Sequence, residues 1–200
     1  MEPSEKKRLP YAVIAIAAAN ILYFLYLQLS GALNNNMMMV EKGALCIING
    51  RYYGGWIPLF TSMFIHFDIR HLGGNMLMLL VVGELLEERL GRIRTLIAYF
   101  ASGLAGNVIT ILWYCFRRMT VVSAGASGAV FGLVGLLCGV VFRAKGRIPG
   151  FSRSRVMVMV FLMLYSGIAN AGINTAAHIG GFFMGLLVSL LYLKIWKFWD

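Results

Sequence analysis

The stretch that decides the fold is residues 127–142, which read Ser-Gly-Ala-Val-Phe-Gly-Leu-Val-Gly-Leu-Leu-Cys-Gly-Val-Val-Phe. None of these residues is charged, and the glycines recur at spacings of three and four, so they share one face of a helix. Glycine faces allow helix backbones to approach closely in a membrane. The stretch therefore predicts a membrane helix that packs tightly against a neighbour. The glycines are Gly128, Gly132, Gly135 and Gly139.

The composition of the whole chain excludes an ordinary soluble protein. Of its 200 residues, 60% are hydrophobic and 13% are charged, whereas a soluble chain is about half apolar and about a quarter charged. The net charge of +10 comes from short basic clusters between apolar runs, so nucleic acid is not an expected partner. The three cysteines have no metal-type spacing. We expect the lipid bilayer to solvate this protein.

Six apolar runs predict six transmembrane helices. A bilayer core needs about 20 apolar residues, with a range of about 17–25, and the second, fourth and fifth runs fall at or below that range. Short helices in a bundle indicate an end that faces a protein-lined cavity inside the membrane. The first run is too long for a signal peptide, so we expect an uncleaved helix. The runs are residues 9–29, 71–86, 93–116, 127–142, 156–168 and 175–195.

The distribution of basic residues predicts that both termini are cytoplasmic. With six helices, 13 of the 18 lysines and arginines fall on the side of the termini and five on the other side, and cytoplasmic loops are enriched in positive charge. We expect a short cytoplasmic tail, residues 1–8, and one transmembrane domain, residues 9–200, in a prokaryotic plasma membrane. The five outer residues are Lys42, Arg51, Arg70, Arg117 and Arg118.

The longest connection, residues 30–70, lies on the outer side. Its several glycines and Pro58 argue against one continuous helix, and its many aromatic side chains are typical of the membrane interface. A structureless loop of this length is unusual in a compact protein. We interpret it as a partly embedded loop or a helical hairpin. The expected fold is therefore an all-α, polytopic bundle of six transmembrane helices with a long outer loop between the first two.

Four polar residues at the ends of the expected helices mark a candidate site. His71 and Asn75 open the second helix, Ser127 opens the fourth, and His178 lies near the start of the sixth. Under the expected topology all four lie at one depth near the outer face. Polar residues inside membrane helices are costly and tend to mark function, so their convergence predicts a functional site.

The surroundings of Ser127 are typical of a nucleophile. A nucleophilic serine needs an exposed hydroxyl and a free backbone N–H beside it, and the start of a helix provides both. The small neighbours Gly125 and Gly128 leave room for a substrate. An N-cap or a small packing residue is the alternative interpretation of such a G-x-S-G segment.

His178 is the candidate general base. It shares one face of the sixth helix with Gly181 and Gly185. If this face packs against the glycine face of the fourth helix, the His178 imidazole meets the Ser127 hydroxyl, as a general base must. The alternative is a hydrogen-bonded packing histidine, but the shared depth and the matched glycine faces favour the catalytic interpretation.

His71 and Asn75 are four residues apart and project from one side of the second helix. Their N–H groups could donate to an oxyanion together with the Ser127 N–H; a capping and packing pair is the alternative. No carboxylate accompanies Ser127 and His178, so a Ser–His dyad is expected. His66 is expected to be a structural, hydrogen-bonding residue of the loop. Because no HExxH motif is present, a metal site is not expected.

Four motifs together resemble the rhomboid family of intramembrane serine proteases, in family order and spacing, and the resemblance covers residues 9–195. The family often has a Trp-Arg pair ahead of the first motif, whereas here the stretch reads Gly55-Trp56-Ile57-Pro58-Leu59-Phe60. The motifs are Thr61-Ser62-Met63-Phe64-Ile65-His66, His71-Leu72-Gly73-Gly74-Asn75-Met76, Gly125-Ala126-Ser127-Gly128-Ala129-Val130-Phe131-Gly132 and Ala177-His178-Ile179-Gly180-Gly181.

The resemblance implies a catalytic Ser127 and His178, an oxyanion site of His71, Asn75 and the Ser127 N–H, and a Phe131 ring beneath the histidine. It also implies cleavage of single-pass transmembrane substrates near the outer membrane surface, without a cofactor. Two other classes remain open at this point. One is a catalytically inactive rhomboid-like protein that binds membrane clients. The other is a small transporter or channel, which predicts charged residues within the spans.

Overall fold

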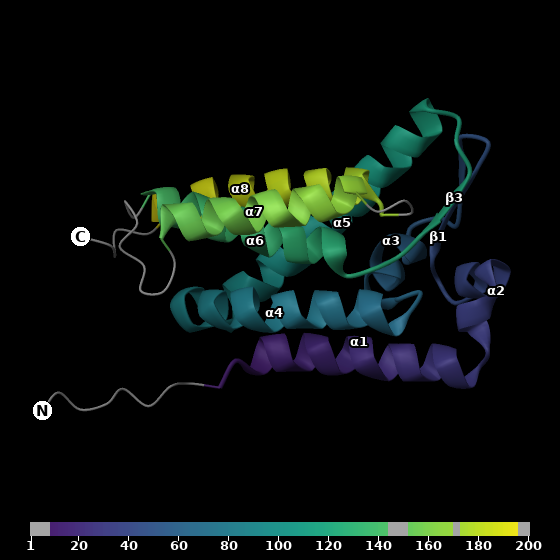
Figure 1. The fold of residues 1–200 in the computed structure, drawn as a ribbon, viewed down its shortest axis with the longest axis horizontal. Helices are drawn as coiled ribbons and strands as arrows, with labels where there is room; N and C mark the ends of the chain where they lie inside the picture. Colours follow the sequence, from purple (N-terminus) through teal and green to yellow (C-terminus); the bar gives the residue numbers. More distant parts are fainter. Residues whose placement is uncertain (1–8, 144–151, 170–172, 196–200) are drawn as a thin grey trace, which may run out of the picture.

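The computed structural model describes residues 9–143, 152–169 and 173–195. The expected tail at residues 1–8 therefore lies outside the described residues, as do the basic residues Lys145, Arg147 and Lys197. The described chain is mostly helical, and its long helices form one bundle (Figure 1). The first long helix begins at the same end of the bundle at which the last one ends.

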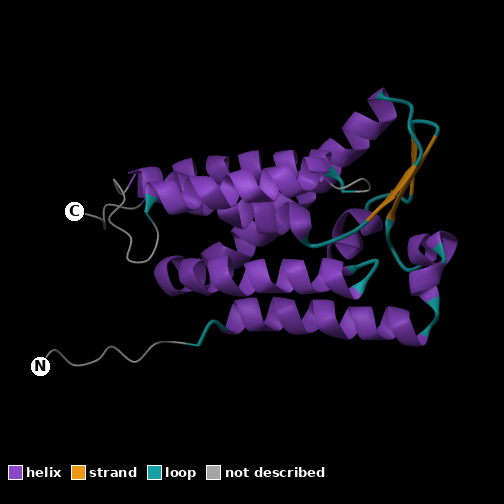
Figure 2. Cartoon of the chain, in the orientation of Figure 1, coloured by secondary structure: helices purple, strands orange, loops and turns teal. Residues whose placement is uncertain are grey.

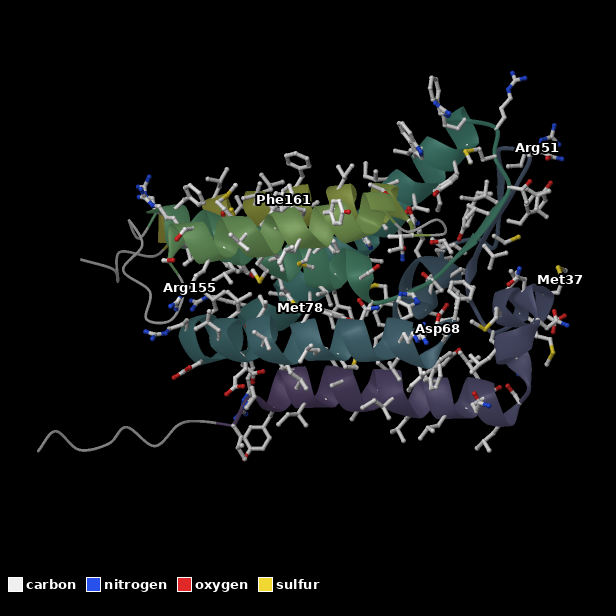
Figure 3. All side chains as sticks on the ribbon, in the orientation of Figure 1. Met37, Arg51, Asp68, Met78, Arg155 and Phe161 are labelled. Atoms are coloured by element: carbon white, nitrogen blue, oxygen red, sulfur yellow. The ribbon has the colours of Figure 1, made fainter. Side chains whose placement is uncertain are left out.

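Six helices in the described part have 17 or more residues. They are α1 Tyr11–Leu29, α4 Ile69–Leu90, α5 Arg92–Phe116, α6 Ser127–Arg143, α7 Arg153–Ala169 and α8 Thr175–Ile195. Among the described residues, four helices (α1, α4, α5 and most of α8) are long and apolar enough to cross a membrane, and α6 is a shorter apolar helix. Large apolar side chains such as Leu22, Leu77 and Phe161 are exposed (Figure 3 labels Phe161). Such an apolar exterior is stable in lipid, so the chain is an integral membrane protein.

α4 is longer than the run at residues 71–86, so the expectation of a short second span is wrong. The helix begins after Asp68, whose carboxylate accepts two N–H groups of the first turn at 2.8 and 2.9 Å as an N-cap. Its charged last turn stays helical because the buried Glu87 carboxylate accepts two N–H groups from the first turn of α1, at 3.1 and 2.9 Å. Glu87, a charged residue that suggests in the sequence that the span has ended, therefore accepts N–H groups of α1 that have no partner within that helix.

α6 is the central helix of the bundle. It packs against α4, α5, α7 and α8, and side chains such as Leu133 and Leu137 are fully buried. A Cβ added at Gly135 would collide with the Phe182 carbonyl of α8, and one at Gly139 would collide with the hydroxyl of Ser189. The close approach of the fourth and sixth expected helices through glycine is therefore confirmed.

The connection between α1 and α4 contains a β-hairpin and is not a helical hairpin. β1 pairs antiparallel with β2 and also with β3, which precedes α6, so the strand order is β2-β1-β3 (Figure 2). The expected all-α fold is wrong at this end of the bundle. The elements are the 3₁₀ helix Ala32–Asn34, α2 Asn36–Glu41, β1 Leu45–Ile48, β2 Arg51–Tyr53, α3 Ile57–Thr61, the 3₁₀ helix Ser62–Phe64 and β3 Val121–Ser123.

The connection between α1 and α4 is anchored to α5 just before α4 begins. Asn107 of α5 donates from Nδ2 to the Leu59 carbonyl at 2.7 Å and to the Ser62 hydroxyl at 2.9 Å. Beside this contact the ring of Phe60 stacks on Phe100 of α5, with centroids 5.4 Å apart and planes at 21°. Polar and aromatic contacts together fix the part of the loop that precedes α4.

Candidate active site

Ser127 is the first residue of α6 and directly follows a turn at Gly125. The φ of Gly125 is +135°, a conformation that L side chains rarely adopt. A Cβ added there would lie 2.8 Å from His71 Nε2 and 3.7 Å from Ser127 Oγ. The His71 imidazole and the Ser127 hydroxyl therefore flank the same glycine, and no larger residue fits between them.

Two hydrogen bonds from the connection between α1 and α4 hold the turn before Ser127. The Gly125 N–H donates to the Ser62 carbonyl at 2.9 Å, and the Ala126 N–H donates to His66 Nε2 at 3.5 Å. His66 is fully buried, and this burial lowers the pKa of its imidazole to about 3, so the ring stays neutral and keeps an acceptor nitrogen for this bond. Within the described residues, the N–H of Ser127 has no such partner. The loop thus bonds the two N–H groups before the serine and leaves the next one free.

His178 lies in the first turn of α8, where it stacks on Phe131 of α6. The ring centroids are 3.9 Å apart and the planes differ by 10°. Phe131 is one turn beyond Ser127 on the same face of α6, so the stacking brings the imidazole to the face that carries the serine. In the part of the chain that the structure describes, the buried Nδ1 of the His178 imidazole has no hydrogen-bond partner. Catalytic hydrogen bonds are often long before a substrate binds.

The backbones of α6 and α8 touch beside these two side chains. A Cβ added at Gly128 would lie 3.4 Å from the carbonyl oxygen of Ala177, the residue before the histidine. A Cβ at Gly181 or Gly185 would collide with carbonyl groups of α6. The glycine face of α8 therefore packs on α6 as the sequence predicts, and Ser127 and His178 start two helices in direct contact.

His71 and Asn75 lie on α4 at the same end of the bundle. The His71 ring packs edge to face with His66, at a centroid distance of 4.9 Å, and parallel to Phe67 at 6.2 Å. Asn75 is 7% exposed, and its Nδ2 has no hydrogen-bond partner among the described residues. A buried donor without a partner costs stability, and it is the kind of group that stabilises an oxyanion.

Two carboxylates of the described chain, those of Asp68 and Glu87, accept N–H groups at helix N-termini. Asp68, three residues before His71 in the chain, caps α4, the helix that carries His71 and Asn75. No three His, Cys, Asp or Glu side chains gather as metal ligands in the described ranges. What the site offers is a hydroxyl, an imidazole and several N–H donors, which are the groups that acyl transfer requires.

Asn174, directly before α8, is a residue that the sequence analysis missed. Its Oδ1 accepts the Ala177 N–H at 3.1 Å, while its Nδ2 donates to Thr110 Oγ1 at 2.8 Å and to Ser123 Oγ at 2.7 Å. An asparagine directly before an apolar run is an N-cap signal, which could have identified the first contact. The contacts with α5 and β3 join distant segments and follow from no local pattern.

Comparisons with known proteins identify one family. The family model for the Rhomboid domain matches residues 53–195. Rhomboid protease GluP of Bacillus subtilis (strain 168) is 31% identical over 175 residues, which cover 86% of this chain and 33% of that protein. The putative rhomboid protease YdcA of the same organism is 36% identical over 139 residues, 69% of this chain and 68% of that protein. Rhomboid protease AarA of Providencia stuartii is 28% identical over 163 residues, 71% of this chain and 58% of that protein.

The matched region contains every residue of the candidate site, from His66 to Gly185. This chain spans about a third of the length of GluP and about two thirds of the length of YdcA. A match over well over half of the chain, together with relatives above 30% identity, shows the family. The chain belongs to the rhomboid family.

Proposed function

We propose that this chain is an intramembrane serine protease in which Ser127 is the nucleophile and His178 the general base. The observation that carries the proposal is the contact between the first turns of α6 and α8, where Phe131 stacks on His178 and Gly128 touches Ala177. Relatives named rhomboid proteases support the same activity. A hydroxyl and an imidazole on touching helices are the minimal groups of a Ser–His dyad.

In the proposed topology, the six long helices are the transmembrane helices of one domain, residues 9–200, preceded by a cytoplasmic tail, residues 1–8. Arg155 lies at the end of the bundle where α1 begins, and Arg51 lies at the opposite end (Figure 3). The excess of basic residues that the sequence predicts on the side of Arg155 supports a cytoplasmic location for both termini in a prokaryotic plasma membrane. The Ser127 end of α6 then faces outward, beneath a partly embedded outer loop.

The proposed substrate is a single-pass transmembrane protein cleaved near the outer membrane surface. Its helix must unwind locally, because a backbone carbonyl in helical hydrogen bonds is not free for attack. Ser127 Oγ attacks the carbonyl carbon while its proton passes to the His178 imidazole. The resulting oxyanion accepts hydrogen bonds from the Ser127 N–H, His71 and the Asn75 amide.

The His178 imidazolium then gives its proton to the leaving amine, the C–N bond breaks, and an acyl ester remains on Ser127. A water molecule attacks the ester carbonyl while His178 accepts its proton. The C–O bond to Ser127 breaks, and the proton returns to the serine oxygen. The substrate is thus hydrolysed by this chain's own side chains, and the reaction needs no cofactor.

The test uses the purified protein in proteoliposomes with a fluorophosphonate probe and a transmembrane reporter. The wild type should label at Ser127 and cleave the reporter, whereas Ser127→Ala and His178→Ala should do neither. Ser189→Ala is the matched control, because Ser189 is a buried serine near the other end of the same helix pair. A wild type that neither labels nor cleaves would overturn the proposal and favour a protein that binds membrane clients.

A further inference from the structure

The side chain of Asn174 joins the segments that lead into both proposed catalytic residues. Its Oδ1 caps α8, four residues before His178, and one of its Nδ2 hydrogens reaches Ser123 of β3, four residues before Ser127. The second Nδ2 hydrogen reaches Thr110 of α5. One amide therefore connects three elements, and both of its donor hydrogens are used.

Further contacts support the hydrogen bond between Asn174 and Thr110 of α5. Thr110 Oγ1 donates to the Gly106 carbonyl at 2.8 Å, so this hydroxyl is left to accept the hydrogen bond from Asn174. One turn before Thr110, a Cβ added at Gly106 would lie 2.7 Å from the Ala177 carbonyl oxygen. The start of α8 is thus held against α5 both by side chains and by direct backbone contact.

The connection to β3 is equally well supported. Ser123 is 7% exposed, and it pairs with Leu45 in the three-stranded sheet. The next residues along the chain, Gly125 and Ala126, are bonded to the outer loop. The segment before Ser127 is therefore held in place, and the Asn174 side chain links this segment to α8 by hydrogen bonds.

Few contacts of the His178 side chain itself orient its imidazole ring. Its buried Nδ1 has no hydrogen-bond partner among the described residues, and the ring contact that orients it is the stacking on Phe131. Where a triad uses a carboxylate to orient the imidazole, this site depends on where the first turn of α8 is held. The Asn174 hydrogen bonds, together with the glycine contacts to α5 and α6, hold that turn.

We propose that Asn174 is a positioning residue, which sets the distance between the His178 imidazole and the Ser127 hydroxyl by holding the start of α8 against β3 and α5. This inference rests on the proposed function. A misplacement of about 1 Å between reacting groups can cost about 100-fold in rate. Loss of the connection should therefore lower kcat by roughly ten- to a hundredfold and leave KM unchanged.

Two variants separate this connection from helix capping. Asn174→Ser retains a good N-cap but is too short to reach the two hydroxyls. Thr110→Val with Ser123→Ala keeps the asparagine cap and removes both acceptors. Thr95→Val is the matched control for Thr110→Val. Thr95 is also buried on α5, and its hydroxyl donates a hydrogen bond to a backbone carbonyl four residues earlier, that of Gly91, at 3.1 Å.

The measurements are kcat and KM for the transmembrane reporter, with active sites counted by fluorophosphonate labelling, and the thermal midpoint. We expect kcat per labelled site to fall in both variants, to fall no further when they are combined, and to stay at the wild-type value in Thr95→Val. If only the labelled fraction or the thermal midpoint falls, Asn174 is merely structural and the inference is wrong. A wild type that does not label would instead remove the proposed function, and the positioning role with it.

Discussion

The ring of Phe131 lies parallel to the imidazole of His178, with centroids 3.9 Å apart and planes that differ by 10°. Because His178 Nδ1 has no hydrogen-bond partner among the described residues, this stacking restrains the ring where a carboxylate is usual. Aromatic pairs contribute about 0.5–1.5 kcal/mol beyond the burial of their surface. The stacking on Phe131 therefore helps to hold the His178 imidazole in one orientation.

Replacement of the stacked ring should lower the rate of the chemical step. In Phe131→Leu we expect kcat to fall by up to about tenfold, since about 1.4 kcal/mol corresponds to a factor of ten, and KM to stay unchanged. Steady-state kinetics with a transmembrane reporter measures both. Phe183→Leu is the control, because Phe183 is 63% exposed on the same helix as His178. Equal losses in the two variants would contradict a specific role for the stacking.

Asn75 should affect activity and stability in opposite directions. Its unpaired, buried Nδ2 costs stability in the resting protein, whereas a donor to the oxyanion speeds the reaction. In Asn75→Leu we expect kcat to fall by about 10²–10³-fold and the thermal midpoint to stay level or rise. Asn20→Leu, at a second buried asparagine on α1, should leave kcat unchanged. An undiminished kcat in Asn75→Leu would remove this residue from the oxyanion site.

His66 should make the protein acid-sensitive. Burial lowers the pKa of His66 from 6.5 to about 3, so the unfolded chain binds a proton at this residue at a higher pH than the native protein does. Its contribution to stability is therefore complete above about pH 6.5 and is lost as the pH falls, by about 1.4 kcal/mol per pH unit down to about pH 3. His66→Gln offers an acceptor that does not titrate, and its thermal midpoint should fall less steeply between pH 7 and pH 4. Parallel pH profiles for the two proteins would refute this assignment.

The glycine contact between α6 and α8 should be intolerant of a single methyl group. A Cβ at Gly135 would collide with the Phe182 carbonyl and lie 3.2 Å from the Leu186 nitrogen. Gly135→Ala should therefore lower the free energy of unfolding by about 1–3 kcal/mol, as overpacking does. Gly73→Ala on α4 is the matched control: a Cβ there meets nothing within 4 Å, and alanine should add about 0.5–1 kcal/mol of helix stability. Thermal unfolding in detergent compares the two, and equal midpoints would contradict the contact.

Sequence reasoning located the long helices and the face through which two of them meet, because both follow local rules. Apolar runs mark membrane helices, and the regular spacing of glycines such as Gly181 and Gly185 marks close backbone approach. The stacking of Phe131 on His178 followed from the family resemblance. The helices and the glycine face depend on residues that are neighbours along one helix, whereas the stacking joins two helices.

The β-hairpin was missed although its turn carries a recognisable signal. Asn49 and Gly50 have φ values of 49° and 76°, as the type I′ turn of a hairpin requires. The third strand and the contacts of Asn174 with Thr110 and Ser123 join segments far apart in the chain, so no local rule could have predicted them.

The pairing of β1 with β3 has a consequence for exchanging parts between relatives. The connection between α1 and α4 contributes β1, and the segment that leads to Ser127 contributes β3, so the two form one unit although about 70 residues of chain separate them. A chimera that imports only this connection from another family member would pair a foreign strand with the native Val121–Ser123 edge. Transplanting both segments together would preserve their pairing, and with it the support beneath the serine.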